Sequence, residues 1–159
     1  MARRHRLERT QILEAPLREV FAFFSDIRNL ETITPEFLNF RNVDVETFEF
    51  RTGSTIDHEM RLFGIPLKWR SVIEEFQADD RFVDSQVTGP YQYWHHLHIF
   101  RDVSGGTEVI DRVDYELPMG ILGELGHGMF VKPMLNSIFE YRQEKLRVLF
   151  EPVSSTNDG

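Results

Sequence analysis

The sequence predicts an α+β domain in which a curved, seven-stranded antiparallel sheet and a long C-terminal helix close around a cavity. Three observations carry this prediction. The apolar period changes from helical to alternating near Phe40, five turn signals follow at short intervals, and a helical period returns in the last part of the chain. A sheet of this kind leaves one apolar face that needs cover, and the C-terminal helix is the obvious cover.

The first strand and two short helices precede the main run of strands. Residues 7–13 alternate loosely, and Pro16 ends this strand while suiting the first turn of a helix. That helix is indicated by apolar side chains at helical spacing, namely Leu17, Val20, Phe21 and Phe24. Asn29 can cap a second brief turn, which breaks at residues 34–35, where Pro35 follows Thr34.

Six strands are predicted from Phe40 onward, separated by breaks at residues 52–53, 63–66, 78–80, 89–90 and 104–106. In the third strand of the sheet, one face carries Ile56, His58, Met60 and Leu62. The facing of the fifth strand stays open, because both of its faces are plausible inward sets: Phe82, Asp84 and Gln86, or Val83, Ser85 and Val87.

The last helix presents one stripe of residues at helical spacing: Leu135, Ile138, Phe139, Arg142, Leu146, Leu149 and Phe150. The glycine-rich segment 120–128 before it lacks the strand-then-helix setting of a phosphate loop. We expect this segment to be loosely held and to gate the cavity, with Met129, Phe130 and Met134 as adaptable lining. The domain is expected to span residues 1–152, and residues 153–159 to form a flexible tail.

Composition excludes several classes of protein. With 159 residues the chain suits one domain, and 41% hydrophobic with 28% charged residues exclude a disordered or collagen-like chain. The net charge of −8 argues against nucleic-acid binding, and the arginines near the N-terminus are read as solvated. No cysteine is present for a disulfide or a thiolate metal site, and no apolar run is long enough to span a bilayer. We expect a cytoplasmic protein without stable membrane insertion.

A hairpin around Gly105 and Gly106 gathers the polar candidates. Alternation places Trp94, His96, His98 and Phe100 on one strand face, and Thr107, Val109 and Asp111 on a face of the next strand. A loop at residues 103–106 then sets Phe100 opposite Val109, His98 opposite Asp111, His96 opposite Val113 and Trp94 opposite Tyr115. Directly opposed side chains are within hydrogen-bonding reach, so a His98–Asp111 pair is predicted. A two-residue shift would bring His96 or Phe100 to Asp111 instead.

Three interpretations of this pair stay open. In the structural one, a buried Asp111 needs a hydrogen-bond partner and histidine supplies it. In the enzymatic one, His98 acts as general acid or base and Asp111 orients it, for enolising, cyclising or dehydrating a keto substrate. In the third, His96 and His98 with Asp111 or His58 bind a metal, although an H-x-H spacing is too common to predict one.

The chain resembles the START and Bet v 1-like (SRPBCC) superfamily, and most of all its ligand-binding group similar to polyketide cyclases and dehydrases. The resemblance rests on the element order and on five segments: residues 15–24 with Asn29-Leu30, residues 64–69, residues 89–100, residues 105–111 and residues 115–118. It covers about residues 6–150. It implies a helix-grip fold with a deep hydrophobic tunnel between sheet and long helix, and it implies no shared catalytic signature.

The expected function is therefore non-catalytic binding or carriage of a hydrophobic small molecule, such as a lipid, an isoprenoid or a polyketide-like compound. The alternative is a polyketide cyclase or dehydratase using His98 and Asp111, and a third candidate is an interaction module with a collapsed interior. No cofactor or metal is predicted, and the apolar outer face of the sixth strand makes a homodimer one candidate assembly. The predicted ligand-binding residues are His58, Trp69, Trp94, His96, His98, Phe100, Asp111, Tyr115, Met129, Phe130 and Met134.

Overall fold

The computed structural model describes residues 3–152; the predicted tail, residues 153–159, lies outside the described residues. Seven antiparallel strands form one sheet in the order β1-β7-β6-β5-β4-β3-β2. They are β1 (Arg4–Leu13), β2 (Arg41–Val43), β3 (Thr55–Leu62), β4 (Ile65–Gln77), β5 (Arg81–Thr88), β6 (Tyr93–Val103) and β7 (Gly106–Glu116). The predicted seven-stranded sheet is thus confirmed.

The connection from β1 to β3 contains the two predicted short helices, α1 (Leu17–Phe24) and α2 (Arg28–Thr32). Pro16 caps α1 in an extended conformation, as expected for a proline at a helix start. The second strand is shorter than predicted, because Asp44 adopts a left-handed backbone conformation (φ 57°) directly after β2. Two single 3₁₀ turns, Glu36–Leu38 and Val45–Thr47, flank this strand.

The part of the chain that follows β7 is helical from Gly120 to Leu149. The glycine-rich segment forms α3 (Gly120–Gly126), a π turn spans His127–Val131, and α4 (Lys132–Leu149) follows without a break. Two contacts tie the first part to the sheet: the Tyr115 hydroxyl lies 2.7 Å from His127 Nε2, and His5 Nε2 lies 3.0 Å from a Glu124 carboxylate oxygen. The segment is therefore an extension of the long helix rather than an irregular loop.

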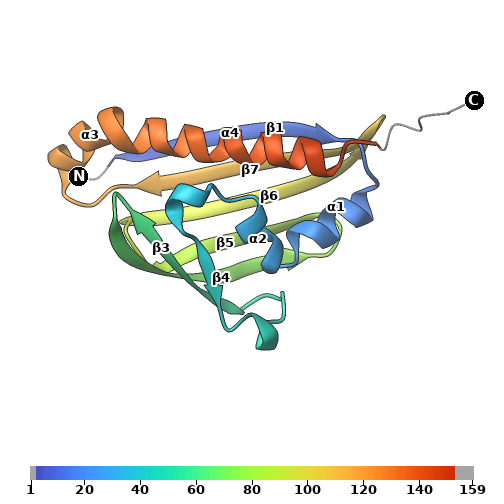
Figure 1. The fold of residues 1–159 in the computed structure, drawn as a ribbon, viewed down its shortest axis with the longest axis horizontal. Coiled ribbons are helices and arrows are strands. Elements are labelled where there is room, and N and C mark those ends of the chain that lie inside the picture. The colour runs from blue at the N-terminus through green and yellow to red at the C-terminus, as the bar shows by residue number, and fades with distance from the viewer. Residues whose placement is uncertain (1–2, 153–159) are drawn as a thin grey trace, which may run out of the picture.

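The long helix lies along β1 and β7, while β3 and β4 curve away from it (Figure 1). Its buried side chains, Leu135, Phe139, Arg142 and Leu146, follow the predicted stripe. Where α1 and the end of α4 approach the sheet, a cluster of phenylalanines fills the interior, with the ring of Phe100 5.0 Å from that of Phe21 and 5.2 Å from that of Phe24. One end of the space between sheet and helix is thus solidly packed, which leaves the middle for a cavity.

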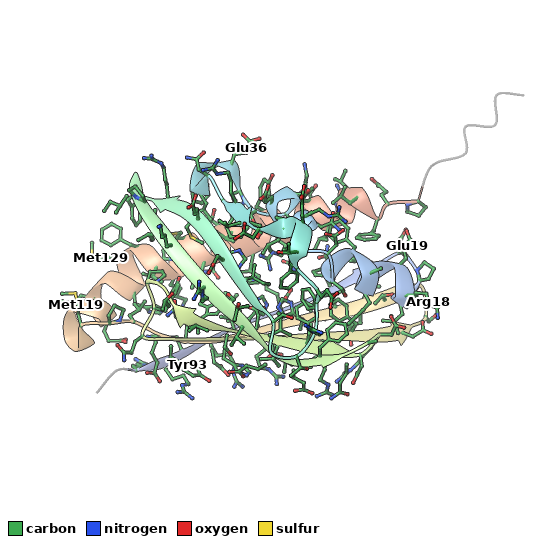
Figure 2. The ribbon with its side chains drawn as sticks, turned by 90° about the horizontal axis from the view of Figure 1, so that it is seen from below. Arg18, Glu19, Glu36, Tyr93, Met119 and Met129 are labelled. Carbon is green, nitrogen blue, oxygen red and sulfur yellow. The ribbon has the colours of Figure 1, made fainter. Side chains whose placement is uncertain are left out.

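The outer face of β6 is covered in part by a charged side chain. Tyr93 projects from the sheet on the side away from the helix (Figure 2), and the Arg4 guanidinium carbon lies 4.0 Å above its ring. Such a cation–π contact screens aromatic surface from water. A homodimer through this face stays a prediction. Among the described helices, none combines the length and the apolar character that crossing a membrane requires.

Candidate functional site

A cavity of about 180 Å³ lies between the concave face of β3 to β6 and the helices α1, α2 and α4. Its wall is mainly apolar and rich in aromatic rings, including Phe23, Phe40, Trp69, Tyr91, Trp94 and Phe139. A surface groove of about 1160 Å³, lined by residues such as Glu31, Arg41 and Lys68, adjoins it. Four residues line both spaces and so mark the boundary between them: Thr34, Phe40, Met60 and Leu67.

Six of the predicted site residues lie in the wall of this cavity: His58, Trp69, Trp94, His96, His98 and Met134. The other five do not, and their predicted placement needs correction: Phe100, Asp111, Tyr115, Met129 and Phe130. Phe100 is only 2% exposed inside the phenylalanine cluster, and Tyr115 packs under Leu135 and Phe139. Asp111 lies behind the two histidines, 2.8 Å from His96 Nε2 and 3.3 Å from His98 Nδ1.

Met129 and Phe130 face outward, with 71% and 54% of their surfaces exposed. Figure 2 shows Met129 at the same end of the molecule as Met119, where α3 begins. The reason is that the helix continues through this segment, so that a rotation of about 100° per residue carries positions 129 and 130 away from the stripe that starts at Leu135. The Phe130 ring instead meets that of Phe63, at the tip of the β3–β4 hairpin, with 6.3 Å between centroids.

The predicted register of the β6–β7 hairpin is confirmed. His98 pairs with Asp111, His96 with Val113, Phe100 with Val109 and Trp94 with Tyr115. The side chains nevertheless bond diagonally. His96 Nε2 donates to Asp111 Oδ1 at 2.8 Å, whereas His98 Nδ1 lies 3.3 Å from the same oxygen without an aligned hydrogen bond. The predicted His98–Asp111 pair is therefore present as a close contact, but the short hydrogen bond to Asp111 comes from His96.

A second carboxylate, from β5, completes the cluster. Asp84 stands opposite His96 in the β5–β6 ladder, yet its Oδ2 accepts a 2.7 Å hydrogen bond from His98 Nε2. The two imidazole rings stack, with centroids 3.6 Å apart. Each histidine therefore bonds the carboxylate that lies diagonally from it rather than the one directly opposite. The question of which face of β5 points inward is thereby settled in favour of Phe82 and Asp84.

The pKa values of the two histidines are shifted in opposite directions. Burial lowers the pKa of His98, but the close contact with Asp111, the hydrogen bond to Asp84 and the charges of both carboxylates outweigh it, so the net shift is upward. Burial and the neighbouring His98 charge lower the pKa of His96. Burial alone would raise the pKa of each carboxyl, but the two histidines hold the pKa of both Asp84 and Asp111 below the usual range. These shifts favour a proton on His98 over one on His96, beside two carboxylates.

A buried arginine reaches the same cavity from the helix. Arg142 is 8% exposed and lines the cavity, with its guanidinium carbon 5.0 Å from the centre of the Phe139 ring. Burial lowers its pKa, while the charges of Asp111 and Asp84 act in the opposite direction. With Arg142 and a protonated His98, two positive charges stand beside the two carboxylates in this part of the interior, which balances the group.

His58 forms a separate polar point of the cavity wall, on β3 of the same sheet. Its Nδ1 lies 2.9 Å from Asn42 Oδ1, and the Asn42 amide nitrogen donates to the Ile27 carbonyl at 2.6 Å. The second bond fixes the orientation of the amide, so Nδ1 of His58 carries the proton and Nε2 is an acceptor. Burial lowers the pKa of His58 to about 4, which keeps the ring neutral at pH 7.

Two groups of side chains within the described residues have donors close enough to hold a metal ion: Asp84 with His96 and His98, and His5 with Glu124 and His127. In the first group the His98 nitrogen that would bind a cation already donates its proton to Asp84, and the Arg142 guanidinium shares the cavity. The predicted absence of a metal stays a prediction.

Sequence reasoning missed Asp84 as a partner and Arg142 as a cavity residue. Arg142 carried a readable signal, since it is the single charged residue in the apolar stripe of the last helix. Asp84 could have been favoured because Phe82, two residues earlier, is the largest side chain on either face of that strand. Nothing in the sequence singles out Asn42 or predicts that Tyr91 turns inward.

Comparison with known proteins places this geometry in context. The family described as polyketide cyclase/dehydrase and lipid transport matches residues 13–147. The ZhuI aromatase/cyclase from Streptomyces sp. R1128 superposes with a TM-score of 0.73 at 13% identity, over 94% of each chain. Protein CV1439 from Chromobacterium violaceum gives a TM-score of 0.69 at 17% identity, over 92% of this chain and 97% of that one.

Ara h 8.0201 also shares the fold, with a TM-score of 0.62 at 12% identity, over 91% of this chain and 98% of its own. Identities this low show a common fold and nothing about the ligand. No curated protein is similar enough in sequence to match.

Proposed function

This chain belongs to the polyketide cyclase/dehydrase and lipid transport family, within the START/Bet v 1-like superfamily, and from that premise we propose that it binds a small hydrophobic molecule in its internal cavity. The observation that carries the proposal is the cavity itself, an aromatic-walled space of about 180 Å³ inside a sheet and helix that are otherwise well packed. A collapsed interior, as in an interaction module, would leave no such space.

The volume narrows the choice of ligand. Pockets for drug-sized compounds start at about 300 Å³, whereas a dry cavity of about 150 Å³ accepts benzene. The cavity of about 180 Å³ therefore suits one ring with a short substituent in the conformation described. A long-chain lipid or a multi-ring polyketide would require α4 or the β3–β4 hairpin to move outward.

Polar groups at separate points of the wall would orient such a ligand. The neutral His58 presents an acceptor nitrogen that suits a ligand hydroxyl, and Trp69 Nε1 is a buried donor without a partner among the described residues. Few polar contacts within an apolar wall are the usual means by which binding sites fix orientation.

Binding is favoured over catalysis by where the nitrogens of His98 point, since Nε2 donates to Asp84 and Nδ1 faces Asp111. His96 Nε2 likewise donates to Asp111, and only His96 Nδ1, 3.9 Å from Asp84 Oδ2, is without a short contact. A general base needs a nitrogen within reach of the substrate proton. The second candidate function, a cyclase or dehydratase, has one supporting observation: 21% of the Asp84 side chain is exposed and Asp84 lines the cavity, so His98 with Asp84 rather than Asp111 would be the reacting pair.

Filling the cavity tests the binding function. Ile138 lines it from α4, and Ile138→Trp should abolish a copurified ligand in native mass spectrometry and weaken binding of the single-ring probe phenylacetamide at least tenfold. Val148→Trp, at an exposed position of the same helix, is the matched control and should change neither. Equal binding by both variants would place the ligand elsewhere and refute the proposal.

The same probe separates the two candidate functions. A binding protein should retain affinity for phenylacetamide within a few-fold after His98→Gln. An enzyme should turn over a keto substrate and lose that turnover in the same variant. Turnover that His98→Gln abolishes would favour the second candidate.

A further inference from the structure

Arg142 is a buried cation for which the described residues supply no hydrogen-bonded partner. It projects from the apolar stripe of α4 into the cavity and is 8% exposed. Its Nε is sealed from solvent and has no hydrogen-bond partner, and within residues 3–152 no carboxylate comes within ion-pair distance of the guanidinium. A guanidinium carries five donors, and leaving charged donors unmet in a protein interior is costly.

The nearest buried anions are already committed elsewhere. Asp111 accepts from His96 at 2.8 Å, and Asp84 accepts from His98 at 2.7 Å. Both carboxylates attract Arg142 only at longer range. Within the described residues the protein thus offsets the charge of Arg142 but leaves its Nε without a hydrogen bond, and the residue lines the cavity.

A second cavity residue shows the same deficit independently. Within residues 3–152 the buried indole nitrogen of Trp69 has no hydrogen-bond partner, and an indole N–H can only donate. Two unmet donors, one charged and one neutral, call for a ligand that brings acceptor oxygens.

We propose that the ligand of this cavity is a single-ring carboxylic acid in its ionised form, whose carboxylate pairs with the Arg142 guanidinium while its ring lies against the aromatic wall. The inference rests on the proposed binding function and specifies the chemical class of the ligand. Arginine and carboxylate match in geometry, since the guanidinium offers parallel donors to two oxygens.

A carboxylate fits better than a phosphate group. Arg142 is the single cavity-lining arginine within the described residues, and Asp84 shares the wall with it. A dianion would add two negative charges to an interior that is neutral beforehand, whereas a carboxylate adds one. The volume of about 180 Å³ also leaves little space beyond a ring and a carboxylate.

The test compares phenylacetate with phenylacetamide, which has nearly the same shape and no charge. Isothermal titration calorimetry at pH 7.5 with wild-type protein should show the acid binding at least tenfold more tightly than the amide. Arg142→Met should remove this preference while leaving the affinity for the amide within a few-fold. Arg147→Met changes a solvent-exposed arginine of the same helix and should preserve the preference.

The outcomes separate this inference from the function on which it rests. If the amide binds and the acid is not preferred, the carboxylate inference is refuted and the binding function stands. A preference that survives Arg142→Met refutes the role of Arg142. If neither compound binds wild-type protein, the single-ring carboxylate inference is refuted, and the binding function is then decided by whether Ile138→Trp loses a copurified ligand. The wild-type comparison decides the charge preference even if Arg142→Met does not fold.

Discussion

Asp111 faces His98 across the β6–β7 ladder, yet its carboxylate accepts its short hydrogen bond, 2.8 Å, from His96 two residues away. Asp84 shows the converse on the other side, standing opposite His96 and bonding His98 at 2.7 Å. These two diagonal hydrogen bonds, made by the stacked rings of β6, connect β5, β6 and β7 through side chains. Each carboxylate therefore has an imidazole partner that is not the histidine directly opposite it. Asp111 is bonded by His96, and Asp84 is bonded by His98.

Removing one charge from this cluster should be costly. Asp111→Asn removes one of the two carboxylates that balance the charges of Arg142 and the histidines. We expect the free energy of unfolding at pH 7 to fall by about 3 kcal/mol, as for other broken buried pairs. Urea denaturation followed by circular dichroism measures it.

Asp114→Asn supplies the control on the same strand. Asp114 forms a 2.7 Å ion pair with Arg6, whose side chain is 57% exposed, so the expected loss is below about 1 kcal/mol. Equal losses in the two variants would mean that the buried cluster contributes no more than a surface pair.

His58 should make the fold sensitive to mild acid. Because burial lowers its pKa in the folded state to about 4 from 6.5, the unfolded chain binds the proton more readily, and stability is lost as the pH falls from 6.5 towards 4. The loss assigned to this one residue is about 3 kcal/mol over that window.

His58→Asn should therefore flatten the dependence of stability on pH between 6.5 and 4, measured by denaturation at several pH values. His95→Asn, on the outer face of β6, is the control and should follow the wild-type profile. A wild-type slope in His58→Asn would show that other groups cause the acid sensitivity.

Arg142 should lower the stability of the empty protein. Its burial costs more than the attraction of Asp84 and Asp111 returns, as the lowered pKa of the guanidinium indicates. Arg142→Met should then raise the unfolding free energy of ligand-free protein by roughly 1 kcal/mol, which corresponds to a melting temperature about 2–4 °C higher.

Differential scanning calorimetry on protein shown by native mass spectrometry to be ligand-free measures this shift, with Arg147→Met as the reference. Such a residue, harmful to the empty fold and useful to the loaded one, is typical of a binding site. A lower melting temperature for Arg142→Met alone would mean that its charge supports the empty fold.

Two glycines of α3 should respond in opposite directions to alanine. Gly126 has a helical backbone (φ −64°) and open space around it, so Gly126→Ala should stabilise the helix by about 1 kcal/mol. A side chain on Gly123 would lie 2.3 Å from the Pro118 carbonyl oxygen, so Gly123→Ala should destabilise.

Hydrogen exchange reports both effects and also tests the predicted gate. We expect residues 120–129 of the wild type to exchange faster than the strands, and Gly126→Ala to slow them. Protection equal to that of the strands in the wild type would exclude opening of this segment.

The sheet, its strand order along the chain and the register of the last hairpin could be predicted because they depend on local rules. Alternation fixes which residues share a face, and the Gly105-Gly106 turn fixes which residues are opposed. The inward position of His58, Trp69, Trp94, His96 and His98 follows from the same period of two. The C-terminal stripe with Arg142 in it follows from the period of the helix.

The tertiary structure alone decided the contacts between side chains on elements that are distant in sequence. The diagonal partners of His96 and His98 depend on how rings stack across three strands, and the exposure of Met129 and Phe130 depends on whether the glycine segment stays helical. The unmet hydrogen bonds of Arg142 depend on where the helix crosses the sheet. Periodicity assigns a residue to a face, but the distance between two side chains on different elements is set by packing, twist and the space that packing leaves.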